Sequence, residues 1–192
     1  MIKKLFFILL TVFLSSAFHD VSKANLQEEL ANKLIGTKTL SFDFVQKIAD
    51  EEEVGSCVIK FPLLMKCKYE DLKEKTIVSN GKTVAIIKKK YKKIYFYKLK
   101  KTPLFIILSK EKILNLIKNS KPNFINSNIL EYKFTGGKSN ELKIFFDKKS
   151  LELKGWETID AYSNKVIFSI INLETNIEIT NDFFKIPKEK DL

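Results

Sequence analysis

The spacing of apolar residues changes from a helical period to a strand period near the start of the chain. Asn25 is a capping residue, and Gly36 ends the helix that follows it. One apolar stripe of that helix is formed by leucines four residues apart: Leu26, Leu30 and Leu34. Alternation begins at residue 40 and predicts a strand with one apolar face: Leu40, Phe42 and Phe44.

Most of the remaining chain keeps the strand period between short turns. Strands are expected over 57–61, 63–69, 76–79, 83–87, 94–99, 129–135, 142–147, 151–160 and 165–173. Most turns are only a few residues long, and the one at Asn80-Gly81 is the strongest hairpin signal. Short connections favour an antiparallel meander over parallel strands with crossovers. Two more helices are expected, a short apolar one after Thr102-Pro103 and another over 110–119.

These elements predict a mainly β protein with about three helices. A strongly twisted antiparallel sheet of nine to eleven strands tends to curl, so we expect an unclosed half-barrel. Its concave face would be apolar and would need a cover. The stripe of the first helix and the apolar turn after Pro103 are the elements that can supply that cover as a lid.

The two cysteines flank a predicted hairpin turn at Pro62. A hairpin centred on that proline places Cys57 directly opposite Cys67. Directly opposed Cβ atoms lie about 4.5–5.5 Å apart, slightly wider than a disulfide requires. In an oxidising compartment this register favours a disulfide, and the alternative is a pair of buried free thiols.

The first 24 residues have the layout of a secretory signal peptide. Lys3 and Lys4 precede an apolar run over 5–18, and Ser22 and Ala24 stand at the −3 and −1 positions of a cleavage site. The run is short for a membrane span, which needs about 20 residues. We therefore expect a signal peptide over 1–24 and one exported domain over 25–192.

Composition argues against several classes of function. The net charge is +11, yet all 34 basic residues are lysine, and the absence of arginine argues against a reader of nucleic acid. The only histidine, His19, lies in the expected signal peptide, which leaves no imidazole for a metal site or a Ser-His-Asp triad. Catalysis by carboxylates or lysines stays open in principle, but no spacing points to it. We expect no enzyme, no metal and no cofactor.

A series of short motifs resembles the outer-membrane lipoprotein carrier (LolA) family across nearly the whole expected mature chain. The motifs, in order, are Phe44-Val45-Gln46, Phe61-Pro62, Ile77-Val78-Ser79-Asn80-Gly81-Lys82, Thr102-Pro103-Leu104, Leu153-Lys154-Gly155-Trp156, and a tail with Phe183, Phe184 and Pro187. Their order and spacing, rather than any one of them, carry the resemblance.

The resemblance implies a periplasmic chaperone, expected to be monomeric, whose cavity holds the acyl chains of lipoproteins. Its partners would be an inner-membrane ABC transporter that loads the cargo and an outer-membrane receptor lipoprotein, or the outer membrane directly, but no nucleic acid. The expected cavity residues are Phe42, Phe44, Ile59, Phe61, Met65 and Phe96. The expected lid residues are Leu30, Leu34, Leu104 and Phe105. The alternative is a lipoprotein- or lipid-sensing module that does not shuttle its ligand.

One position departs from the family pattern. Family members often carry an arginine just before the hairpin proline, where it helps to hold the lid closed, but here that residue is Phe61. We therefore expect lid closure to rest on apolar contacts, with Lys66 as a weaker polar substitute.

Overall fold

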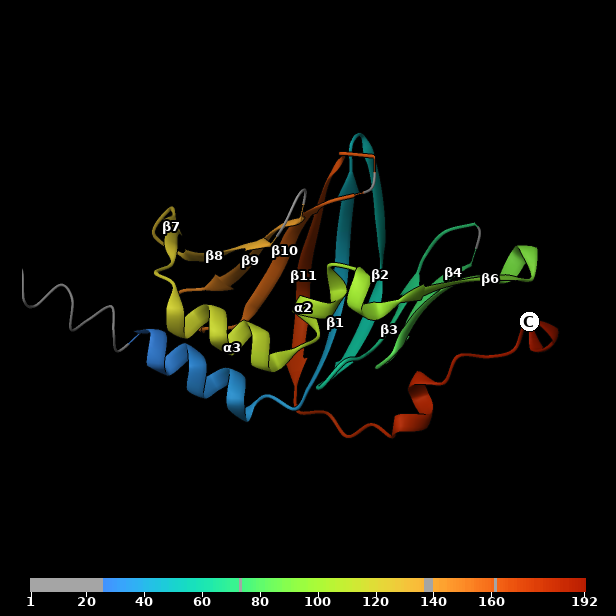
Figure 1. Cartoon of the computed structure of the whole chain (residues 1–192), viewed down its shortest axis with the longest axis horizontal. Helices are drawn as coiled ribbons and strands as arrows, with labels where there is room; N and C mark the ends of the chain where they lie inside the picture. The colour runs from blue at the N-terminus through green and yellow to red at the C-terminus, as the bar shows by residue number, and fades with distance from the viewer. Residues whose placement is uncertain (1–25, 73, 137–139, 161) are drawn as a thin grey trace, which may run out of the picture.

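One open antiparallel sheet of eleven strands dominates the computed structural model, which describes residues 26–72, 74–136, 140–160 and 162–192 (Figure 1). The strands are β1 (Thr39–Ile48), β2 (Glu51–Lys60), β3 (Leu64–Tyr69), β4 (Lys75–Asn80), β5 (Thr83–Lys88), β6 (Lys93–Lys98), β7 (Asn123–Ile125), β8 (Ile129–Gly136), β9 (Asn140–Asp147), β10 (Leu153–Ile159) and β11 (Lys165–Thr175). The expected signal peptide, 1–24, lies outside the described residues.

The sheet consists of two meanders joined by one long-range strand pair. Its order is β6-β5-β4-β3-β2-β1-β11-β10-β9-β8-β7, so β6 and β7 are free edges and the sheet is not closed. The joining pair, β1 with β11, runs from Leu40 opposite Thr175 to Ile48 opposite Val166. The predicted mainly β, unclosed fold with three α-helices is confirmed, and β7 is a short strand that the pattern did not predict.

The helices lie over one face of the sheet, called here the inner face (Figure 1). They are an N-terminal helix over 26–36, α2 (Leu104–Ile107) and α3 (Lys110–Asn119). Ser109 caps α3 by accepting a hydrogen bond from the backbone N–H of Lys112 at 3.4 Å. The backbone N–H of Leu63 in the β2–β3 turn donates to the carbonyl of Leu108 at 3.0 Å, which ties the segment between α2 and α3 to the sheet.

The opposite, outer face has a smaller core of its own. Val78, Ala85, Ile87 and Ile94 are buried there against the C-terminal tail. Lys66 also lies on this face, where its Nζ donates to the carbonyl of Phe183 in the tail at 3.2 Å. The expectation that Lys66 helps to close the lid is therefore wrong, because alternation along β3 places it on the other side of the sheet.

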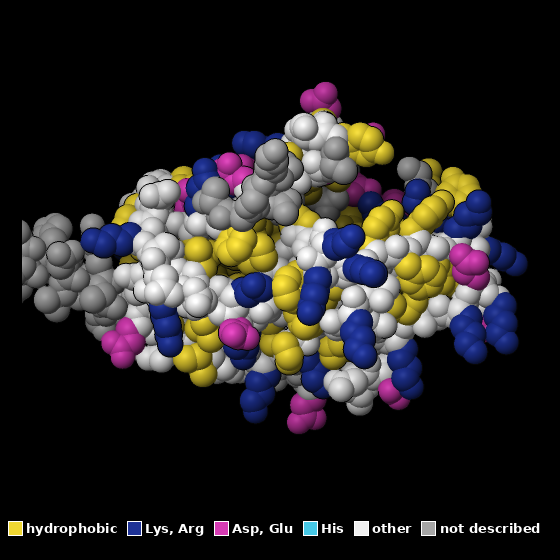
Figure 2. All heavy atoms as spheres, in the orientation of Figure 1, with side chains coloured by type: hydrophobic (Ala, Val, Ile, Leu, Met, Phe, Trp, Pro, Cys, Tyr) yellow, Lys and Arg dark blue, Asp and Glu magenta, His cyan; other side chains and the backbone are white. Residues whose placement is uncertain are grey.

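Lysines are spread over the exposed surface, as Figure 2 shows for one face of the molecule. Their distribution fits the mainly solvated role expected of them. Lysine and hydrophobic side chains also gather together at the end of the molecule where Figure 1 places β6.

Candidate functional site

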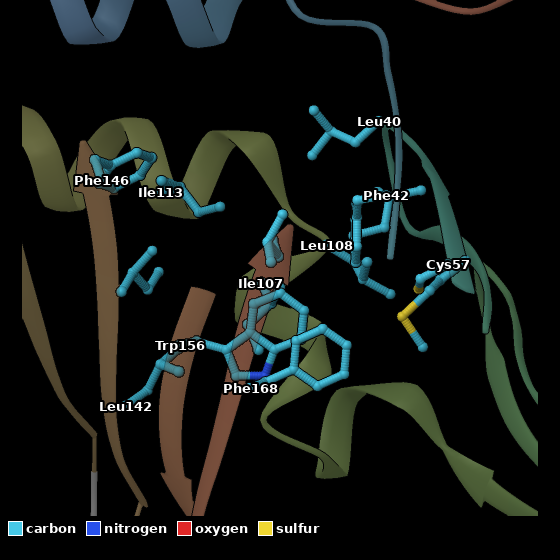
Figure 3. Close-up of a cluster of buried hydrophobic side chains, with 14 of the residues drawn as sticks. Leu40, Phe42, Cys57, Ile107, Leu108, Ile113, Leu142, Phe146, Trp156 and Phe168 are labelled. Carbon is cyan, nitrogen blue, oxygen red and sulfur yellow. The ribbon is translucent and has the colours of Figure 1, made fainter. Parts of the chain in front are cut away.

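A row of stacked aromatic rings crosses the inner face of the sheet. The rings of Trp156 and Phe168 are stacked with centroids 4.1 Å apart and planes at 6°. Phe168 stacks in turn on Phe44 at 4.5 Å, and Phe44 meets the ring of Tyr69 edge-on at 4.9 Å. Figure 3 shows Trp156 and Phe168 among the other buried side chains. The row joins β10, β11, β1 and β3 into one continuous apolar floor.

Gly55 on β2 makes this row possible, because β2 lies between β1 and β3. A Cβ atom at this position would lie 2.1 Å from the carbonyl oxygen of Lys68 and 2.9 Å from Cζ of Phe44. The rings of Phe44 and Tyr69 can therefore meet across β2 only because no side chain stands between them.

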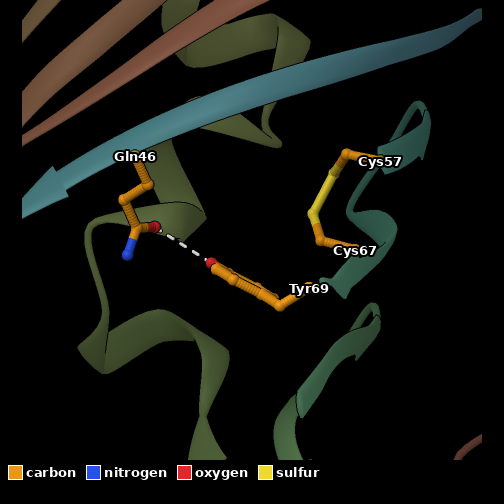
Figure 4. The surroundings of a disulfide bond; sticks show 4 residues. All are labelled: Gln46, Cys57, Cys67 and Tyr69. Atoms are coloured by element: carbon orange, nitrogen blue, oxygen red, sulfur yellow. Dashed lines mark hydrogen bonds between the residues drawn. A yellow bond between two sulfur atoms is a disulfide. The ribbon is translucent and has the colours of Figure 1, made fainter. Parts of the chain in front are cut away.

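Tyr69 is held in place by a short polar chain at the end of the row. Its hydroxyl donates to Oε1 of Gln46 at 2.9 Å (Figure 4), and Nε2 of Gln46 donates to Oε2 of Glu53 at 3.0 Å. Burial raises the pKa of Tyr69, and the charges of Glu53 and Asp71 raise it further, so the phenol stays a proton donor. Gln46 of the Phe-x-Gln motif thus orients one ring of the floor.

The two cysteines form the disulfide that their register predicts. Cys57 and Cys67 lie directly opposite each other on β2 and β3, with Cα atoms 4.0 Å apart (Figure 4). Both side chains are buried on the inner face. The bond fixes the β2–β3 hairpin close to the aromatic row, and the prediction is confirmed.

Lys110 connects α3 to the end of the N-terminal helix. Its Nζ donates to the carbonyls of Ile35 at 3.1 Å and Thr37 at 2.5 Å, and it lies 5.5 Å from the ring centroid of Phe61. A cation is favoured at the carbonyl end of a helix. Burial, with the charge of Lys38 nearby, lowers the pKa of Lys110. The expectation that closure rests on apolar contacts, with Lys66 as the weaker polar substitute, is therefore wrong in its polar part, because Lys110 makes that contact.

Gln27 makes the matching contact at the other end of the helix pair. Its Nε2 donates to the carbonyls of Ile117 at 2.7 Å and Ser120 at 2.8 Å, at the end of α3. Each helix thus binds the carbonyl end of the other, so the two helices run antiparallel. Lys33 adds a contact to the sheet by donating to the carbonyl of Ser150 at 2.6 Å.

Directly beneath the N-terminal helix the space against the sheet is small, whereas wider hollows of about 350 Å³ along α3 and about 180 Å³ beside α2 lie at the sides. A cavity of about 30 Å³ remains, lined mostly by apolar side chains that include Leu34, Phe61 and Ile113. Sites for small organic ligands usually have volumes of about 300–1,000 Å³. An acyl chain therefore fits into this cavity, beneath the N-terminal helix, only if the helix moves away from the sheet.

Most of the residues expected at the site do lie at this interface. Those buried on the inner face or under the helices are Phe42, Phe44, Ile59, Met65, Leu30 and Leu34. Phe61, Leu104 and Phe105 are partly buried against the same core. The residues of this interface that were not among the expected site residues include Phe168, Trp156, Ile107, Leu108 and Ile113, although the burial of the apolar turn after Pro103 was expected. The alternation over 151–160 and 165–173, the apolar turn after Pro103 and the apolar side of α3 were the signals that could have identified them.

Phe96 is the exception, and its expected place in the cavity is wrong. It pairs with Ala85 on β5, whose side chain belongs to the outer core, and Phe96 is 59% exposed. Its neighbours Tyr95 and Tyr97 point toward the inner side instead, because Tyr97 pairs with Val84 of the inner core. Alternation in the sequence places Phe96 on one face of β6 and its neighbours Tyr95 and Tyr97 on the other, but it does not identify which face points inward.

Within the described ranges, no helix is long and apolar enough to cross a membrane.

Comparisons with solved structures show a related fold at low sequence identity. An uncharacterized conserved protein from Thermus thermophilus superposes with a TM-score of 0.51 at 8% identity, over 86% of this chain and 94% of that one. LolA superfamily protein NE2245 from Nitrosomonas europaea gives 0.46 at 7% identity, over 85% and 97%. The Pseudomonas aeruginosa MucA/MucB complex gives 0.47 at 10% identity, over 88% of this chain and 62% of the matched chain.

Sequence comparison assigns the family. No curated protein matches the chain. The family model described as outer membrane lipoprotein carrier protein LolA matches residues 36–187. Because that match covers most of the sequence, the chain belongs to the LolA family.

Proposed function

We propose that this protein is a periplasmic carrier that binds the acyl chains of lipoproteins against the inner face of its sheet. The observation that carries the proposal is the combination of a continuous apolar floor and a cover held by few polar contacts. The floor runs from Trp156 to Tyr69, and the main polar contacts between the covering helices come from Lys110 and Gln27.

The burial of an acyl chain can keep the open, cargo-bound form stable against water once loading has taken place. Burial contributes about 0.8 kcal/mol per CH₂ group, so a chain of about sixteen carbons gains about 12 kcal/mol relative to water. A hydrogen bond from a charged donor contributes about 1.5–3 kcal/mol. The two contacts of Lys110, with the weaker neutral ones of Gln27, are therefore smaller in total than the burial of one chain. The bound chain also replaces the apolar contacts that helix residues such as Leu30 and Ile113 lose on opening. Without cargo, the same contacts keep the apolar floor away from water.

Export to the periplasm fits the other features of the chain. Residues 1–24 have the features of a signal peptide, and disulfides such as the one between Cys57 and Cys67 persist in oxidising compartments. The domain that follows, 25–192, acts as a monomer and performs no catalysis.

The energetics also indicate the kind of partners that the carrier needs. An acyl chain in a bilayer is already out of water, so its transfer to the carrier releases little free energy. Loading therefore requires energy from another source, which the inner-membrane ABC transporter of the family would supply. Release occurs at the outer membrane, either to a receptor lipoprotein or to the membrane itself.

The test is extraction and transfer of a labelled lipoprotein. We expect the purified protein to release radiolabelled lipoprotein from spheroplasts into the supernatant as a complex, and then to pass it to outer-membrane vesicles. Spheroplasts incubated with buffer or with an unrelated periplasmic protein are the controls. Label that never leaves the spheroplasts contradicts acyl-chain carriage. Label that is extracted but never transferred indicates a binding module without shuttling.

A further inference from the structure

The free edge of the sheet at β6 carries an unusual concentration of lysine and exposed aromatic side chains. Residues 88–101 contain eight lysines and no acidic residue. Four aromatic side chains of this segment are largely exposed: Tyr91 at 54%, Tyr95 at 43%, Phe96 at 59% and Tyr97 at 49%. Figure 2 shows hydrophobic side chains among lysines at this end of the molecule.

The aromatic rings lie on both sides of the edge strand. Phe96 points to the outer side of the sheet, whereas Tyr95 and Tyr97 point to the inner side. Tyr91 lies in the 3-10 turn η1 (Lys89–Tyr91) that precedes β6. The rings therefore flank the edge itself and do not form a patch on one face of the sheet.

Most of the positive charge at this edge has no acidic partner. Within the described part of the chain, Lys89 is the one lysine of the eight in an ion pair, with Glu74 at 3.7 Å. Lys88 lies over the ring of Tyr95 at 5.6 Å. Glu189 of the tail accepts a hydrogen bond from the backbone N–H of Ile94 and covers part of the edge. The remaining lysines extend into solvent.

Two simpler explanations account for only part of this arrangement. Lysines on an edge strand prevent pairing with other sheets, but that role does not require four exposed aromatic rings. A binding site for single-stranded nucleic acid also contains lysines and aromatic rings, but its rings line one groove so that successive bases can stack on them. Here Phe96 and Tyr97 point to opposite sides of the strand.

A bilayer surface with negative headgroups matches both features. Tyrosine and other amphipathic rings concentrate at the level of the headgroups, and clusters of four to eight lysines attract anionic lipids. A membrane can also contact rings on both sides of an edge, because headgroups surround an edge that is inserted end-on.

The lysines of this edge continue to the helices that cover the inner face. Lys100 and Lys101, in the turn after β6, line a hollow of about 180 Å³ together with Phe105 and Ile106 of α2. An edge bound to a membrane would thus lie next to α2, one of the helices that cover the inner face.

We propose that the β6 edge, with its exposed rings and lysines, is a docking surface for anionic phospholipid membranes. Docking requires neither the apolar floor nor any cargo, so this proposal goes beyond acyl-chain carriage and can fail independently of it. The lysines contact the headgroups, and the rings of Tyr95, Phe96 and Tyr97 lie at the interface.

The test is co-sedimentation of the protein with vesicles. Vesicles of phosphatidylglycerol and phosphatidylethanolamine are compared with vesicles of phosphatidylcholine, at about 0.1 M salt and again at about 1 M, where charges are screened within about 3 Å. We expect binding to the anionic vesicles only, and loss of that binding at high salt. Equal binding to both kinds of vesicle, or to neither, would overturn the proposal.

Paired variants assign the binding to this edge. Lys92→Glu with Lys93→Glu should lower the partition onto anionic vesicles at least about tenfold, since each lysine near the surface contributes to the attraction. The matched control, Lys149→Glu with Lys154→Glu, makes the same charge change at exposed positions on the other half of the sheet and should change it less than about threefold. Equal loss in both pairs would show a general charge effect and overturn the proposal.

A second pair tests the rings. Phe96→Ser with Tyr97→Ser should lower the partition about tenfold, whereas Tyr162→Ser, at a side chain that is 86% exposed, should leave it unchanged. Circular dichroism and the midpoint of denaturant unfolding confirm that each variant is folded. A single-stranded oligonucleotide is added as a competitor. If it binds more tightly than the vesicles and displaces the protein from them, the edge is a nucleic-acid site and membrane docking is overturned.

Discussion

Lys110→Met should bind a fluorescent fatty-acid probe about tenfold more tightly than the unmodified protein, although it should also unfold at a lower denaturant concentration. The ammonium group of Lys110 donates to the carbonyls of Ile35 and Thr37 and holds the N-terminal helix against α3. A charge-assisted hydrogen bond contributes about 1.5–3 kcal/mol, and about 1.4 kcal/mol corresponds to a tenfold change in affinity. Because the cavity beneath the N-terminal helix is too small for a chain while that helix is held closed, a less stable closed form leaves more of the binding-competent form.

Lys112→Met is the matched control for this prediction. Lys112 lies in the same turn of α3, where its ammonium group is 5.3 Å from the ring centroid of Phe105. The substitution removes the same charge but leaves both carbonyl contacts of Lys110 intact, so probe affinity should change less than about twofold. Weaker or unchanged binding in Lys110→Met, together with lost stability, would show that the contact supports the fold and does not limit opening.

Phe168→Ala should produce the largest loss of stability among single substitutions in the aromatic row, about 3–5 kcal/mol. Phe168 is 4% exposed and lies between the rings of Trp156 and Phe44, and it also meets Phe42 edge-on at 6.2 Å. Its removal leaves a cavity at the centre of the inner core. The measurement is the free energy of unfolding from denaturant titration with the disulfide intact.

Phe96→Ala makes the same chemical change at an exposed position. With 59% of its surface exposed, Phe96 should contribute little, and the substitution should change the free energy of unfolding by less than about 0.5 kcal/mol. Similar losses in the two variants would mean that the row at Phe168 is not the central part of the core.

The features that the sequence predicts correctly are those fixed by local pattern. The stripe of leucines predicts the N-terminal helix, and the range expected for the last helix, 110–119, agrees with α3. The hairpin at Pro62 sets the register of β2 and β3, so Cys57 and Cys67 meet as expected. In these cases the deciding residues are close in sequence, and a turn or a period relates them directly.

The features that it does not predict depend on contacts between distant segments. The pairing of β1 with β11 sets which strands adjoin, and only this pairing brings Phe44 onto Phe168. The register of β6 with β5 determines which side chains of β6 face inward, and alternation in the sequence does not reveal that register. Lys110 resembles any solvated lysine in the sequence, because its carbonyl partners lie on a helix more than seventy residues earlier.

Trp156 offers the most direct measurement of acyl-chain binding at the inner face. It is the only tryptophan of the chain, it is 5% exposed, and it forms one end of the aromatic row. A brominated fatty acid quenches indole fluorescence on contact, whereas acrylamide reports access from water. We expect a bound brominated chain to quench the fluorescence of Trp156 strongly and the unbrominated chain to leave it unquenched. Acrylamide should quench it little, because Trp156 is shielded from water. A parallel measurement with a radiolabelled chain shows whether the chain is bound. If it is bound and the brominated chain still leaves the emission of Trp156 unchanged, binding at the inner face of the sheet is contradicted.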